Sequence, residues 1–326
     1  MDLRQLALAR GARTLVETCA AVQPGEHLLV VTDIARPFAV AEAIALAGER
    51  VGAHVTTVIM HPISSGQEPP APVRGAMLAA DVILAPVTGS LFHTTAAKEA
   101  AAAGARLLSV TEASEMLFID GACLADFERV AETAERVRAL LSAANQVRVT
   151  APGGTDVTMS LAGREAMKVT GMAREPGVRA GWPDIEAFIA PVEGTATGTV
   201  VIDASASNIG LIREPIRFEI AAGRVVSVEG GGQAPEVARS LAATGHEGSS
   251  VIAELGIGLN PAGLVRGHII EDEGVYGTAH VALGNNTNFT GGLNWAPIHF
   301  DYVFREPTIT LDGRTIMTAG ELVDER

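Results

Sequence analysis

The sequence is poor in cysteine, with only Cys19 and Cys123 among its 326 residues. The two lie far apart in the chain, and neither belongs to a CxxC pair or has a histidine beside it. Disulfide-stabilised folds and thiolate metal sites need several closely spaced cysteines, so both classes are excluded. The scarcity of cysteine also predicts a protein of a reducing compartment, and we expect it in the cytoplasm.

Basic residues are outnumbered as well, because 24 lysines and arginines face 38 aspartates and glutamates and leave a net charge of −14. Nucleic acids and anionic membranes attract basic surfaces, so we expect neither as a partner. No stretch reaches the roughly 18 uncharged apolar residues of a membrane span, and the charged amino-terminal segment is unlike a signal peptide. The expected partner is therefore a small-molecule substrate.

Apolar residues, in contrast, are plentiful. Hydrophobic residues make up 48% of the chain and charged residues 19%, and the mean hydropathy is +0.27. A chain of this composition can bury a large core and is not disordered. Single cores stop growing near about 250 to 300 residues, so the length predicts two domains.

Residues 1–145 alternate between predicted strands and helices. Apolar runs typical of buried parallel strands are found at residues 27–33, 54–60, 79–88 and 106–111. Helical patterns separate them, one at residues 93–105, and a helix at residues 125–144 with Asp126 near its start follows. The pattern predicts a Rossmann-like α/β domain with a doubly wound, mostly parallel sheet. The turn after the first strand lacks the glycine fingerprint of dinucleotide sites, which disfavours a nicotinamide cofactor.

The pattern changes at about residue 146. Short alternating strands now follow one another, separated by glycine, aspartate and asparagine turns that are typical of antiparallel sheets. One predicted helix, at residues 235–245, interrupts them. We therefore predict a second domain over residues 146–326, mainly antiparallel β within an α+β fold.

The second domain holds the strongest candidates for chemistry. His299 and Asp301 are two residues apart in the segment WAPIHFDYVF, so on a strand both side chains leave the same face. Imidazole and carboxylate together suit a divalent metal ion. Taken alone, this short motif is more often a hydrogen-bonded surface pair.

Glu254 and His280 strengthen the metal hypothesis. Both occur inside apolar, strand-like runs, where an ionisable side chain is costly unless a partner or a metal compensates it. The alternatives are a core histidine bonded to a backbone carbonyl and a buried pair of Glu254 with an arginine such as Arg266. Glu186, in WPDIEAFIAPVEG, is a further ligand, a general base or an exposed strand-edge glutamate.

His93 is the candidate of the first domain. It follows the carboxyl end of a predicted strand, the position where open α/β sheets hold ligands. Local packing at the start of the following helix is the alternative. The segments GNNTN and GGLNWAP near His280 and His299 are turn sequences that let the backbone approach a ligand closely, although ordinary hairpin loops have the same composition.

These motifs together resemble a known family. The segments SLFHT, WPDIEAFIAPVEGTATG, AELGIGLNP, EDEGVYGTAHVALGNN and HFD resemble, in this order, the aminopeptidase T group of metallopeptidases and its shorter relatives, the 2,5-dihydroxypyridine 5,6-dioxygenases. The resemblance covers nearly the whole chain and suggests a homodimer. For the peptidase branch it implies a two-metal centre of Zn, Co or Mn, with ligands at Glu186, Glu254, His280, His299 and Asp301.

The dioxygenase branch implies a different ligand set. A single Fe(II) would be held by His299, Asp301 and a second histidine, His246 or His280, with His93 as the acid or base. The chain length favours this branch. So does the segment 275–277, which reads Val-Tyr-Gly where the peptidases carry a further glutamate.

We therefore predict an Fe(II)-dependent dioxygenase that opens the ring of a hydroxylated pyridine or a similar aromatic compound. The first alternative is a metallo-aminopeptidase of the aminopeptidase T type, in which Glu186 or Glu254 shuttles the proton of a metal-activated water. The second is a non-catalytic protein that binds a small molecule through a buried network of acids and histidines.

Overall fold

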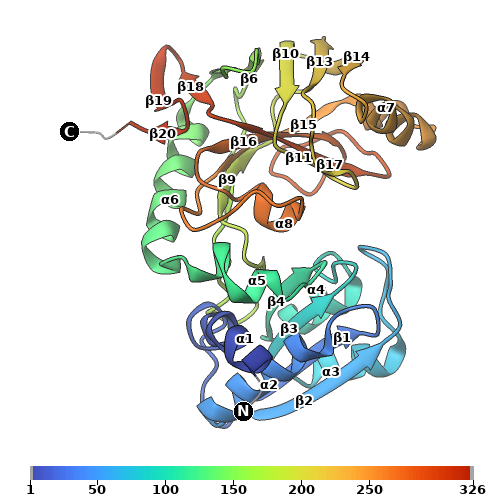
Figure 1. The fold of residues 1–326 in the computed structure, drawn as a ribbon, viewed down its shortest axis with the longest axis vertical. Coiled ribbons are helices and arrows are strands. Elements are labelled where there is room, and N and C mark those ends of the chain that lie inside the picture. Colours follow the sequence, from blue (N-terminus) through green and yellow to red (C-terminus); the bar gives the residue numbers. More distant parts are fainter. Residues whose placement is uncertain (1–2, 324–326) are drawn as a thin grey trace. The chain divides into compact units, whose positions relative to one another are not determined.

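The computed structural model describes residues 3–323 (Figure 1). The chain forms two compact units, the first comprising Met1–Val130 with Val169–Asp184 and the second Ala131–Lys168 with Ile185–Arg326. Helix α6 (Phe127–Ala143) begins in the first unit and ends in the second. No helix of the described residues is long and apolar enough to cross a membrane.

The first unit is built on sheet A, whose strands all run parallel. Their order across the sheet is β2 (His54–Met60), β1 (His27–Asp33), β3 (Val82–Val87), β4 (Arg106–Thr111) and β8 (Arg179–Gly181). The inner strands are apolar along their whole length because both faces of the sheet are covered, which is usual for parallel sheets. The predicted doubly wound α/β arrangement is confirmed.

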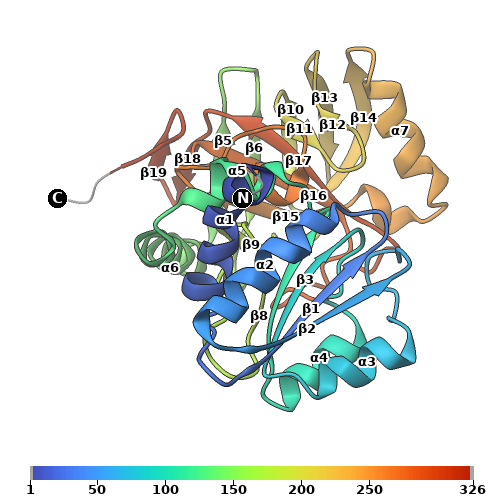
Figure 2. The ribbon, with the colours of Figure 1, turned by 60° about the horizontal axis from the view of Figure 1, so that its bottom comes forward.

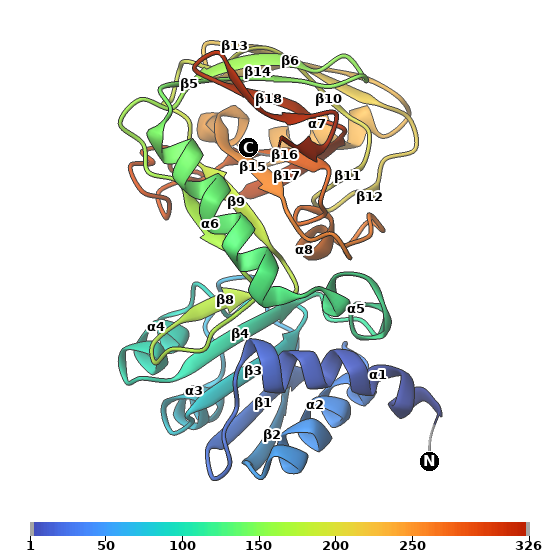
Figure 3. The same cartoon turned by 90° about the vertical axis from the view of Figure 1, so that its left-hand side faces the viewer.

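Helices cover both faces of sheet A. Figures 2 and 3 show α1 (Leu3–Arg13) and α2 (Phe38–Val51) on one face, and α3 (Ala71–Leu78) and α4 (Thr95–Ala102) on the other. Short helical segments complete the unit: η1 (Thr14–Cys19), α5 (Met116–Ile119) and η2 (Gly121–Leu124).

Side-chain caps explain where two of the helices begin. The hydroxyl of Thr94 accepts the backbone N–H of Ala97, so α4 begins at Thr95 and not at His93 as the sequence pattern predicts. Asp126 caps α6 as predicted, because its carboxylate accepts the backbone N–H of Arg129. His93 consequently lies in the loop before α4.

The three-residue strand β8 comes from beyond residue 146 yet belongs to sheet A. It pairs in parallel with β4, and Trp182, which follows it, is fully buried against Phe118 of the same unit. Sequence periodicity predicts the division near residue 145 and gives no sign of this return.

The second unit contains two antiparallel sheets. Sheet B has the order β14 (Arg224–Gly230), β13 (Ile216–Ala221), β10 (Thr197–Ile202), β6 (Asp156–Ser160), β5 (Gln146–Thr150), β18 (Thr308–Leu311), β19 (Arg314–Thr318) and β20 (Glu321–Leu322). Sheet C has the order β12 (Gly210–Leu211), β11 (Ser205–Ala206), β17 (His299–Arg305), β16 (Thr278–Gly284), β15 (Ile252–Gly258), β9 (Glu186–Ile189) and β7 (Met167–Val169). The helices of this unit are α7 (Ala234–Ala243), η3 (Glu247–Ser250) and α8 (Ile269–Asp272). The predicted antiparallel β character is confirmed.

The two sheets of this unit form successive layers (Figure 3). Their apolar faces meet where Phe218 of β13 lies edge-on to Tyr302 of β17, with ring centroids 4.9 Å apart. Both rings are buried. Because side chains alternate along a strand, the neighbours of Tyr302 on β17 point to the opposite face of sheet C. That face carries the ionisable residues.

Candidate metal centre

Four adjacent strands of sheet C carry ionisable side chains on one face. Residues directly opposite each other in a sheet share a face, and the face alternates along each strand. Glu254 of β15 is opposite Ala282 of β16, which is opposite Asp301 of β17. The other pairs that fall on this face are Gly256 with His280, Gly258 with Glu186, and Gly284 with His299.

The carboxylate of Glu254 lies between two imidazoles. Its Oε2 is 2.9 Å from Nε2 of His299, and its Oε1 is 3.6 Å from Nε2 of His280. His280 Nε2 is also 3.3 Å from Oε2 of Glu186, and His299 Nε2 is 3.4 Å from Oδ1 of Asp301. The five side chains thus form two groups that share Glu254, and within each group the donor atoms lie within 4.8 Å of one another.

A glycine makes this arrangement sterically possible. A Cβ on Gly256 would lie 2.1 Å from ring atoms of His280 and 2.9 Å from Oε2 of Glu186. Such distances are far inside van der Waals contact, so the imidazole of His280 occupies the space that any other residue would fill at position 256. The glycine was part of the AELGIG segment, but its composition alone gave no sign of this role.

The five side chains interact strongly in the absence of a cation. Burial disfavours the charged carboxyl of Glu254, yet His280 and His299 outweigh burial and hold its pKa below the ordinary value. The pKa of Asp301 is lowered in the same way, with His299 as the main opponent of burial. Burial also disfavours the charged imidazole of His299, but Asp301 and Glu254 raise its pKa well above the ordinary value. The carboxylates are therefore ionised at neutral pH and attract positive charge.

The ring of His299 is held from its other side by a backbone carbonyl. Its Nδ1 lies 2.8 Å from the carbonyl oxygen of Asn285, and since this oxygen can only accept, Nδ1 carries the proton. Nε2 therefore faces Glu254 and Asp301. Histidines that bind metals are commonly oriented by a hydrogen bond of this kind from the nitrogen that does not bind.

The chemistry of the cluster fits a divalent cation. Three carboxylates and two imidazoles face one another here, and only the side chain of His299, at 31%, is more than slightly exposed. Among residues 3–323, no lysine or arginine pairs with Glu254 or Asp301. Buried carboxylates without a basic partner are costly unless a cation binds them, and carboxylate with imidazole is a typical donor set for Fe, Mn or Zn.

His246 lies outside both groups. It precedes η3, its Nδ1 accepts the backbone N–H of Gly248 at 3.1 Å, and its ring lies edge-on to Trp295 with centroids 4.8 Å apart. His93 belongs to the first unit, where its ring lies edge-on to that of Phe92 at 4.8 Å. Arg266, considered above as a partner of Glu254, has its backbone N–H bonded to Asp272.

Comparison with known proteins gives this geometry a family. The family profile described as NicX, 2,5-dihydroxypyridine 5,6-dioxygenase, matches residues 8–324. The chain belongs to this family. A curated relative, the 2,5-dihydroxypyridine 5,6-dioxygenase of Pseudomonas putida KT2440, is 29% identical over 262 residues, which span 76% of this chain and 72% of the relative.

Two solved structures share the fold over the whole chain. The 2,5-dihydroxypyridine dioxygenase from P. putida KT2440 superposes with a TM-score of 0.81 at 22% identity, covering 99% of this chain and 98% of the other. Wild-type AmpT from Thermus thermophilus superposes with a TM-score of 0.71 at 18% identity, covering 98% and 99%. The predicted family resemblance is confirmed, and the chain is an enzyme of this family.

Proposed function

We propose that this enzyme is a metal-dependent dioxygenase that opens the ring of a dihydroxypyridine or a closely related hydroxylated aromatic compound. Membership of the family carries the proposal, and the cluster around Glu254 supplies a donor set that suits it. In such a reaction both atoms of dioxygen enter the product while a ring carbon–carbon bond breaks. The substrate supplies the electrons, so no separate reductant is required.

The proposed ligands are the residues whose donor atoms already converge. His299 and Asp301 form the centre of the set, and Glu254 lies next to both. Of the two candidates for a further histidine, the distances favour His280, because its Nε2 faces Glu186 and Glu254 whereas His246 faces Trp295. Fe(II) held by such a set supplies the redox chemistry of ring opening.

The remaining roles fall to the chain's own side chains. His93 is the proposed acid or base for the substrate hydroxyl, on the strength of the family resemblance and its position after β3. Glu186 is the proposed second proton acceptor, because it is buried and faces His280. Phe289 keeps water from one side of His299, since its ring lies edge-on to the imidazole with centroids 5.4 Å apart.

The experiment is an oxygen-uptake assay. Protein purified without oxygen and loaded with Fe(II) should consume dioxygen in a one-to-one ratio with added 2,5-dihydroxypyridine, and a chelator should abolish the uptake. Protein that contains stoichiometric metal but neither consumes oxygen nor alters any dihydroxypyridine would contradict the proposal. A chain that binds no metal and is unaffected by chelator would instead act as a binding protein.

One observation keeps the aminopeptidase alternative in view. The two oxygens of Glu254 face different histidines, an arrangement that lets a carboxylate bridge two metal ions, as in two-metal hydrolases. Hydrolysis of leucine p-nitroanilide without oxygen uptake, by protein carrying two ions of Zn, Co or Mn, would establish this alternative.

A further inference from the structure

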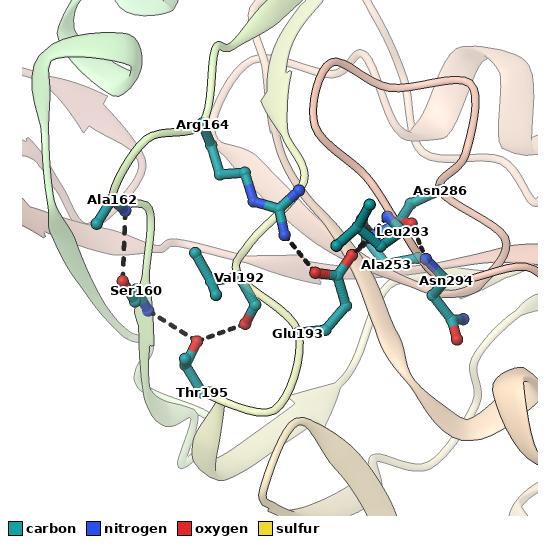
Figure 4. A network of polar contacts seen from close by, with 10 residues as sticks. All are labelled: Ser160, Ala162, Arg164, Val192, Glu193, Thr195, Ala253, Asn286, Leu293 and Asn294. Carbon is teal, nitrogen blue, oxygen red and sulfur yellow. Dashed lines mark hydrogen bonds and ion pairs between the residues drawn. The ribbon is translucent and has the colours of Figure 1, made fainter.

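A loop next to the cluster is tied down by a network of buried polar side chains (Figure 4). This loop, residues 285–298, connects β16 to β17 and is called the 285–298 loop below. It contributes the Asn285 carbonyl that accepts Nδ1–H of His299. It also contributes Phe289, whose ring contacts both His299 and Phe188 of β9. The conformation of the loop therefore determines how the imidazole of His299 is held.

Glu193 is the anchor of this loop. One oxygen of its carboxylate accepts the side-chain N–H of Asn286 at 3.0 Å and the backbone N–H of Leu293 at 2.9 Å. The other oxygen pairs with Arg164, whose side chain is only 7% exposed. Burial disfavours the charged form of Glu193, but its donors in the loop and Arg164 outweigh it and lower its pKa. A single carboxylate thus joins both ends of the loop to the residues after β6.

Asn286 carries the restraint toward the cluster. It is fully buried and pairs with Asn294 through both its backbone and its side chain, which closes the base of the loop. Its side-chain N–H also reaches the carbonyl of Ala253, the residue before Glu254, at 3.4 Å. Because Asn285 is the adjacent residue, the position of its carbonyl follows from that of Asn286.

Two glycines let the loop lie this close to its anchors. A Cβ on Gly292 would be 2.0 Å from the carbonyl oxygen of Asn286, and one on Gly291 would be 3.0 Å from a guanidinium nitrogen of Arg164. Gly291 also has a positive φ of 81°, which other residues rarely adopt. The turn that carries Glu193 is itself fixed, since Thr195 bonds both to Val192 and to the strand residue Ser160.

We propose that Glu193 is a positioning residue for the metal centre, which together with Arg164 and Asn286 fixes the loop carbonyl that orients His299. The inference rests on the proposed metal site but concerns residues that hold no metal themselves. Its chemical basis is that partners which orient a ligating histidine contribute to metal affinity without touching the ion.

The test uses Glu193→Gln in the full-length protein. Glutamine can still accept from Leu293, but it leaves the buried Arg164 without a counter-charge and places an amide against that of Asn286. We expect the dissociation constant for Co²⁺ to rise about 10-fold. In the metal-free protein, amide exchange at Leu293 should become about 10-fold faster, since this amide is protected by the hydrogen bond that the substitution weakens.

The ring N–H of His299 gives a readout that a general loss of stability would not move. In metal-free protein its downfield proton signal, assigned by its absence from His299→Gln, should exchange faster with water in Glu193→Gln. The matched control is Glu219→Gln, because Glu219 also pairs with an arginine and accepts from a threonine but lies in sheet B. The control should leave all three measurements at their wild-type values.

Several outcomes would overturn the proposal. Wild-type behaviour of folded Glu193→Gln in the three measurements would do so, and so would weaker Co²⁺ binding with an unchanged His299 signal. If Glu193→Gln does not fold, Arg164→Gln keeps both donors of the loop and is judged by the same results. If the wild-type chain binds no metal, the proposed function fails, whereas the two measurements on metal-free protein still decide the positioning role.

Discussion

The imidazole of His280 lies directly across the α-carbon of Gly256, its partner on the neighbouring strand β15. This contact couples the backbone of one strand to a candidate ligand of the next. It leads to the first of four predictions.

Gly256→Ala should displace His280 and Glu186, because the added methyl group would lie 2.1 Å and 2.9 Å from their side-chain atoms. We expect at least about a 10-fold loss of metal affinity, and overpacking should lower the free energy of unfolding by about 1–3 kcal/mol. Isothermal titration with Co²⁺ and urea unfolding measure the two effects.

The matched control for this substitution is Gly75→Ala. Gly75 lies in helix α3 with no atom within 4 Å of a built Cβ, so alanine there should raise the free energy of unfolding by about 0.5–1 kcal/mol and leave metal affinity unchanged. Equal metal affinity in Gly256→Ala and the wild type would show that His280 is not a ligand.

Asp301→Asn should abolish metal retention while leaving the fold intact. The substitution keeps the size of the side chain but removes a charge that faces His299 Nε2 at 3.4 Å. Metal analysis after gel filtration should find stoichiometric metal in the wild type and almost none in the variant. Asp156→Asn, on the exposed edge of a surface ion pair with Arg148, should retain the metal. Unchanged metal content in Asp301→Asn would remove Asp301 from the ligand set.

The two thiols should be unreactive in the native protein. Cys19 and Cys123 are both fully buried, and burial raises the pKa of Cys19 to about 12. Since the thiolate is the reactive form, a thiol reagent at pH 8 should label neither residue until the protein is unfolded, when both should react. Rapid labelling of either cysteine under native conditions would show that its surroundings open readily.

Glu135 should contribute to stability in a pH-dependent way. Hydrogen bonds from Arg138 and then Lys168 lower its pKa from 4.5 to about 2. A lowered carboxyl pKa stabilises the fold above the unfolded value, and this contribution is lost as the pH falls from 4.5 toward about 2. Glu135→Gln should therefore be slightly less stable than the wild type at pH 7, with a smaller difference at pH 3.

The effect at Glu135 should remain small because the side chain is exposed and solvent screens it. Urea unfolding at both pH values, repeated in high salt, provides the measurement. Salt should reduce the difference at pH 7. A difference that is the same at pH 3 and pH 7 would show that the charge of Glu135 is not its cause.

The sequence allowed much of the fold to be predicted because the signals were local. Continuous apolar runs marked β1, β3 and β4, and the alternation beyond residue 146 marked the antiparallel sheets. Strand β8 escaped prediction because three residues are too few to show a period and its pairing with β4 is a long-range contact.

The candidate site was predictable only where its residues carry a chemical signature. Glu254 and His280 stood out because ionisable groups in apolar strands need compensation. Gly256 acts through the side chain it lacks and Asn285 through a backbone carbonyl, and neither property depends on a side chain that sequence reasoning could single out. Choosing between His246 and His280 required knowing which ring faces Glu254.

The alternation along β17 also matters for folding. His299 and Asp301 face the cluster, whereas Tyr302 between the layers packs on Phe218. A slip of one residue between β16 and β17 would exchange the two sets, burying charges in the sandwich and turning an aromatic ring outward. The bulk of Tyr302 therefore acts as a register lock: the same residue that fills the core ensures that only the catalytically competent pairing of this hairpin is stable.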